Sequence, residues 1–118
     1  MSLAANIVVA LIALLHVYIL VLEMFLWDKP AGRRAFGLTQ EMATSTKALA
    51  ANQGLYNGFL AAGLFWGLWL GSAGQPVKVF FLLCVLVAGV FGAATASRKI
   101  LFIQAVPAAI GLALVLLA

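Results

Sequence analysis

Residues 3–27 read LAANIVVALIALLHVYILVLEMFLW, and this stretch decides the fold class of the chain. It has the length and character of a membrane-spanning helix, yet it holds a histidine, His16, and a carboxylate, Glu23. Three more apolar runs follow, so we predict helices over about 3–27, 48–70, 77–97 and 99–118. The sequence therefore predicts an all-α fold, a bundle of four transmembrane helices.

The composition agrees with this class. Hydrophobic residues make up 66% of the chain and charged residues only 8%, and the apolar residues stand in runs rather than alternating with polar ones. The connecting segments leave no room for a soluble domain. We therefore predict one four-span membrane domain over residues 1–118, with the lipid bilayer as its main partner.

The basic residues predict an orientation, because Lys and Arg accumulate in cytoplasmic loops. Only Lys78 falls on one side of the predicted spans. The other six fall on the opposite side, in the loop after the first span and in the last connector: Lys29, Arg33, Arg34, Lys47, Arg98 and Lys99. We therefore predict a cytoplasmic loop after the first span and both termini outside the cytoplasm. The net charge of +4 then reflects topology, and we expect no nucleic-acid partner.

The loop from Asp28 to Thr46 mixes apolar residues such as Phe36 and Met42 with basic and polar ones. This pattern predicts a segment that lies on the membrane surface. Hydroxyl residues at its end are candidate N-caps for the second span, which we expect to begin within a few residues of Lys47: Thr44, Ser45 and Thr46.

Polar residues gather in one leaflet. Counting about 1.5 Å per residue from the cytoplasmic ends places Glu23 about 6 Å deep and His16 about 16 Å deep. The remaining polar groups at similar depth are candidate ligand-binding residues: Asn52, Gln53, Tyr56, Asn57, Thr95 and Gln104. Because such groups are costly in lipid, we expect them to point toward one another, toward water or toward a ligand.

The arrangement around the helices supports a common site. His16 and Glu23 are seven residues apart, which places them on one face of the first span. On the second span, Gly54 and Gly58 lie among the polar residues and allow another helix to approach closely.

Several motifs resemble a family of small bacterial membrane proteins catalogued as domain of unknown function 1304. The most specific is AANQGLYNGFLAAG at residues 50–63; LHVY at 15–18, LEMFLW at 22–27, GAATA at 92–96 and QAVPA at 104–108 accompany it. The resemblance covers essentially the full chain and implies a multi-pass protein of the bacterial inner membrane. It implies no activity.

Three hypotheses for function remain open. In the one we favour, the polar residues line an intramembrane pocket in the cytoplasmic leaflet that binds or modifies a small amphipathic or lipid-like molecule. In the second, the chain is a small proton-linked transporter, which would need a homo-oligomer because four short helices enclose too little space. In the third, it is a non-catalytic scaffold whose polar groups hold helices together.

Other chemistry finds little support in the sequence. The chain has one cysteine, Cys84, so a dithiol is excluded. His16 and Glu23 lie about 10 Å apart along their helix and cannot chelate one ion unaided, so we predict no metal. No nucleotide fingerprint or phosphate loop is present, and we predict no cofactor.

Overall fold

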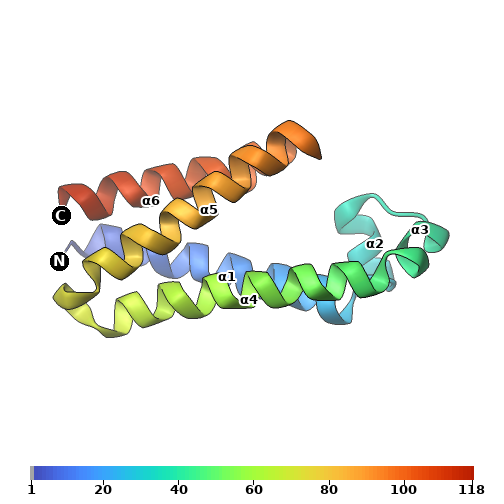
Figure 1. Cartoon of the computed structure of the whole chain (residues 1–118), viewed down its shortest axis with the longest axis horizontal. Helices are drawn as coiled ribbons and strands as arrows, with labels where there is room; N and C mark the ends of the chain where they lie inside the picture. The colour runs from blue at the N-terminus through green and yellow to red at the C-terminus, as the bar shows by residue number, and fades with distance from the viewer. Residues whose placement is uncertain (1) are drawn as a thin grey trace. The chain divides into compact units, whose positions relative to one another are not determined.

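The computed structural model describes residues 2–118, and every regular element in this part of the chain is helical (Figure 1). The all-α prediction is confirmed. The elements are α1 (Leu3–Phe25), α2 (Pro30–Phe36), α3 (Gln40–Ser45), α4 (Lys47–Trp69), the 3₁₀ helix η1 (Gly71–Gly74), α5 (Gln75–Thr95), the π-helix η2 (Leu101–Ala105) and α6 (Val106–Leu117).

The ends of the long helices follow from local chemistry. Helix α4 begins at Lys47, as predicted. It stops before Gly71, whose φ of 65° is a left-handed conformation that glycine adopts without steric cost. Helix α5 then begins with Pro76 in its first turn, where a missing backbone N–H does no harm.

The predicted surface loop contains more structure than its sequence indicated, because α2 and α3 both lie within it. The Thr39 hydroxyl caps α3 by accepting a hydrogen bond from the Met42 backbone N–H at 3.1 Å. Of the N-cap candidates Thr44, Ser45 and Thr46, only Thr46 directly precedes α4, where its carbonyl accepts the Ala50 backbone N–H at 2.9 Å. Their hydroxyls donate to carbonyls in the preceding turn, those of Gln40 and Met42, as hydroxyls at the end of a helix commonly do.

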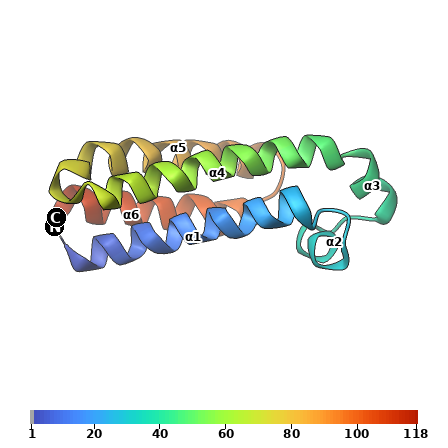
Figure 2. The ribbon, with the colours of Figure 1, turned by 90° about the horizontal axis from the view of Figure 1, so that it is seen from below.

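The chain divides into two compact units, Met1–Ala13 with Ala62–Ala118 (unit 1) and Leu14–Ala61 (unit 2). In unit 1, α5 and α6 lie side by side (Figures 1 and 2). Gly89 allows this approach, because a Cβ atom there would lie 2.9 Å from the backbone nitrogen of Ala105. Its buried core draws on all four long helices: Ala5, Val9, Leu64, Leu82, Val85, Ala108 and Val115.

Unit 2 contains the second half of α1, the two short helices and the first half of α4. Its buried apolar residues include Leu22, Ala43 and Ala50. Figure 2 shows α2 and α3 in the connection between α1 and α4.

The last apolar run is not one uniform α-helix. Residues Leu101–Ala105 form a π-helix directly before α6, with Pro107 in the first turn of α6. Such wide turns are rare and occur mostly as short segments within helices.

Within residues 2–118, two helical stretches are long and apolar enough to cross a bilayer, Leu3–Phe25 and Gly71–Thr95, and the apolar stretch Leu101–Leu117 is shorter. Helix α4 is as long as α1, at 23 residues, but it carries several amides among its apolar residues.

Candidate functional site

The structure joins one carboxylate and one amide of the predicted site. In unit 2, Nδ2 of Asn57 on α4 donates a hydrogen bond of 2.6 Å to Oε1 of Glu23 on α1. The same amide also donates to the Gln53 carbonyl oxygen at 3.1 Å. Both side chains are half-buried, so the pair combines a carboxyl acceptor with restricted access to solvent.

Two glycines create the space for this pair. A Cβ atom on Gly54 would lie 2.5 Å from Cγ of Met24 and 3.1 Å from Cβ of Glu23. A Cβ atom on Gly58 would lie 2.7 Å from Cδ1 of Leu20. The predicted close approach at these glycines is confirmed, and it brings the backbone of α4 within reach of Glu23.

His16, the other ionisable residue of the first apolar run, is completely buried. It lies on α1 two turns before Glu23. Its role in ligand binding stays a prediction.

The other polar residues of α4 behave differently. Asn52, Gln53 and Tyr56 are exposed, and their role in ligand binding stays a prediction. The helix itself explains part of this, because the Asn52 amide donates to the Ala48 carbonyl at 3.0 Å. The Tyr56 ring contacts Phe59 of the same helix, with 6.2 Å between ring centroids.

The last two candidates belong to unit 1 and are engaged with backbone carbonyls. The Thr95 hydroxyl is exposed and donates to the Phe91 carbonyl at 2.7 Å. The Gln104 amide, within the π-helix, donates to the Val85 carbonyl of α5 at 3.0 Å. Gln104 thus helps to join the π-helix to α5.

A polar cluster in unit 1 escaped the sequence analysis. Lys78 of α5 is completely buried, and its Nζ donates to Oδ1 of Asn6 on α1 at 3.2 Å. Nearby on α5, the Gln75 amide donates to the Val115 carbonyl of α6 at 3.1 Å. In the sequence, Asn6, Gln75 and Lys78 are polar residues near the ends of apolar runs, but their spacing does not show that they form one cluster.

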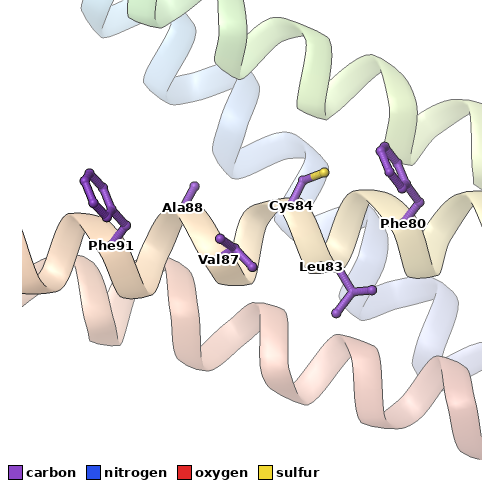
Figure 3. A pocket seen from close by; sticks show the side chains of 6 residues that line it. All are labelled: Phe80, Leu83, Cys84, Val87, Ala88 and Phe91. Carbon is purple, nitrogen blue, oxygen red and sulfur yellow. The ribbon is translucent and has the colours of Figure 1, made fainter.

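Helix α5 also carries a shallow apolar hollow of about 600 Å³ (Figure 3). All the residues that line it come from this one helix: Phe80, Leu83, Cys84, Val87, Ala88 and Phe91. It includes none of the predicted site residues. Among the described residues, no group of three or more His, Cys, Asp and Glu could hold a metal ion.

An ion pair connects the start of the loop with the start of α4. Nζ of Lys47 lies 3.0 Å from Oδ2 of Asp28. The hydrogen bond from Lys47 lowers the pKa of Asp28 below its ordinary value of 3.8. Lys47 is 58% exposed, so salt screens the attraction.

This ion pair predicts a pH dependence of stability. A carboxyl group with a lowered pKa stabilises the fold above its ordinary pKa, and that contribution is lost as pH falls through the lowered value. We expect Asp28→Asn to unfold at a lower temperature than wild type at neutral pH and low salt. The difference should shrink to nothing in acid and in high salt, as measured by thermal unfolding in detergent. A matched control is Glu41→Gln, an exposed carboxylate on α3; a pH-independent deficit in Asp28→Asn would contradict the prediction.

The chain is similar to a known protein family and to a protein of Lactococcus lactis. The profile of a family described as "Protein of unknown function (DUF1304)" matches residues 10–116. A protein of Lactococcus lactis subsp. lactis (strain IL1403), described as "Uncharacterized protein YpaA", is 29% identical over 106 residues, which cover 88% of this chain and 89% of the relative. No solved structure matches the chain. The family match includes every candidate site residue.

Proposed function

The chain belongs to the DUF1304 family, whose description assigns no activity, and on that premise we propose a function from its own residues. We propose that it is a four-span protein of the bacterial inner membrane. In this proposal, the carboxylate–amide pair of Glu23 and Asn57 is the centre of a binding site for a small amphipathic molecule. The hydrogen bond between these two side chains is the observation on which the proposal rests.

The membrane placement is supported by length and exposure. The most apolar part of Leu3–Phe25 is only 28% buried within the protein, and that of Gly71–Thr95 is only 22% buried. The core helix of a soluble protein, by contrast, is mostly buried. Large apolar side chains such as Leu11 and Phe91 are more than half exposed. Lipid is the solvent that such surfaces favour.

The orientation is supported by the positions of the cations. Lys78 is completely buried, so it does not act as an exposed loop charge. The other six cations lie between Lys29 and Lys47 or at Arg98 and Lys99. Under the positive-inside rule, these two connectors face the cytoplasm and both termini lie outside it.

The chemistry of Glu23 indicates the kind of ligand. A charged carboxylate within a span costs about 2.5 to 3.5 kcal/mol on insertion scales, so a partner that donates hydrogen bonds is favoured. Asn57 contributes one such donor, to Oε1. Exposed Gln53 and Tyr56 on the same helix add polar contacts beside it. We therefore propose a ligand with a cationic or hydrogen-bond-donating head and an apolar tail.

A long-chain alkylammonium ion is a suitable first probe, because it has both features. With the protein in lipid nanodiscs, we expect Glu23→Gln to weaken binding of this probe about tenfold, the loss expected for a charge-assisted hydrogen bond. Glu41→Gln, which removes an exposed carboxylate from α3, should bind like wild type.

Equal binding by wild type and Glu23→Gln would overturn the ligand proposal. The carboxylate would then serve as a contact between helices, as in the scaffold hypothesis. Proton-linked transport is a separate prediction, and proton uptake by reconstituted vesicles under a pH gradient tests it.

A further inference from the structure

The loop between α1 and α4 is built against the end of α1. Gly32 of α2 is buried, and a Cβ atom there would overlap the carbonyl oxygen of Leu26. At the end of the same short helix, the Phe36 ring contacts the Trp27 ring with 4.8 Å between centroids. Helix α2, shown beside the end of α1 in Figure 2, therefore has a defined position.

The other end of the loop is held as well. The Trp27 indole donates to the Thr46 hydroxyl oxygen at 3.0 Å. Asp28, the acidic residue nearest to α2 along the chain, forms the ion pair with Lys47. The basic residues of α2 are therefore left without that carboxylate as a partner.

Arg33 differs from the neighbouring basic residues in being partly buried. Its side chain is half-buried, and its Nε atom is buried and makes no hydrogen bond within residues 2–118. A partly dehydrated cation without a compensating anion is costly, so it gains more from an arriving anion than a fully hydrated one does. Lys29 and Arg34 are exposed beside it, and the Arg33 backbone N–H bonds the Lys29 carbonyl at 3.0 Å.

We propose that Arg33, together with Lys29 and Arg34, binds the headgroup phosphate of an anionic phospholipid. Arginine is suited to phosphate because its planar guanidinium donates several hydrogen bonds in a fixed geometry. We assign a lipid as the ligand because the same loop also exposes apolar side chains. Phe36 is 40% exposed and Met42 is 51% exposed. The inference rests on the proposed membrane placement, in which this loop meets the anionic cytoplasmic leaflet.

The test measures retained lipid. Protein is reconstituted in nanodiscs of phosphatidylcholine with a minority of phosphatidylglycerol, and the phosphatidylglycerol that remains bound is counted by native mass spectrometry. We expect Arg33→Gln to lower the affinity about tenfold. Arg98→Gln removes an equal charge from the other connector, where Arg98 is exposed, and should lower it no more than about twofold.

Two further variants separate a built site from general charge attraction. Arg33→Lys keeps the charge but loses the planar fork, so its affinity should fall between wild type and Arg33→Gln. Gly32→Ala keeps every charge but displaces α2, so it should lose lipid nearly as strongly as Arg33→Gln. Equal losses in Arg33→Gln and Arg98→Gln, with none in Gly32→Ala, would overturn the proposal.

A competition experiment distinguishes a lipid phosphate from a soluble phosphate as the ligand. Free glycerol phosphate should displace little phosphatidylglycerol, because it lacks the acyl chains that lie along the apolar part of the protein. Displacement at comparable concentrations would overturn the lipid assignment in favour of a soluble anion. The alkylammonium test of Glu23 is independent of this one. If Glu23→Gln lost probe binding while Arg33→Gln retained its phosphatidylglycerol, the lipid proposal would be refuted and the ligand proposal for Glu23 would stand.

Discussion

We expect Asn6→Leu to lower the stability of the protein by about 1.5 to 3 kcal/mol, the range for a hydrogen bond to a charged group. Asn6 accepts a hydrogen bond from Lys78, whose side chain is completely buried. Leucine has a similar size but no acceptor, so a buried ammonium loses a partner at this position. Thermal unfolding in detergent measures the change.

Lys78→Met is the matched comparison. It removes the charge and keeps much of the side-chain volume, and buried charges replaced in this way often change stability little. We expect Lys78→Met to stay within about 1 kcal/mol of wild type and the double variant Asn6→Leu/Lys78→Met to recover most of the loss. Additive losses in the double variant would show that the two side chains act independently.

The second large effect concerns the turn between α4 and α5. A Cβ atom on Gly74 would overlap the carbonyl oxygen of Gly67, and backbone atoms cannot yield as the end of a side chain can. The φ of Gly74 is −85°, which alanine adopts without strain, so any loss comes from this contact. We expect Gly74→Ala to destabilise the protein by at least about 1 to 3 kcal/mol.

Gly92→Ala provides the control, because its new Cβ would lie 3.2 Å from two methyl groups of Ile100, which can shift. Alanine is also the better helix former by about 1 kcal/mol, so this variant should be neutral or stabilised. If Gly74→Ala unfolded at the same temperature as Gly92→Ala, the close approach of Gly67 and Gly74 would not contribute to stability.

Hydropathy and turn chemistry were sufficient to predict α1, α4 and α5, whereas the helix predicted over 99–118 contains the π-helix η2 before α6. The end of α4 before Gly71 and the start of α5, which has Pro76 in its first turn, follow from residues with fixed conformational preferences. The pairing of Glu23 with Asn57 could have been suspected, because Gly54 allows the close approach that brings α4 next to Glu23.

The environment of Lys78 was not predictable by the same means. Charge counting treats every lysine near a helix end as hydrated, whereas here the chain bends so that Gly67 leaves room for the Lys78 stem. The exposure of Asn52 was missed for a related reason, since its amide bonds its own helix. Both outcomes depend on tertiary geometry that spacing along the sequence does not contain.

The short final helix has a consequence for the surrounding bilayer. At about 1.5 Å per residue, α1 extends about 34 Å, whereas Leu101–Leu117 extends about 25 Å. In the membrane placement proposed above, the latter falls short of a hydrocarbon layer of about 30 Å. Such hydrophobic mismatch is relieved by local thinning, so lipids with shorter acyl chains should collect beside α6.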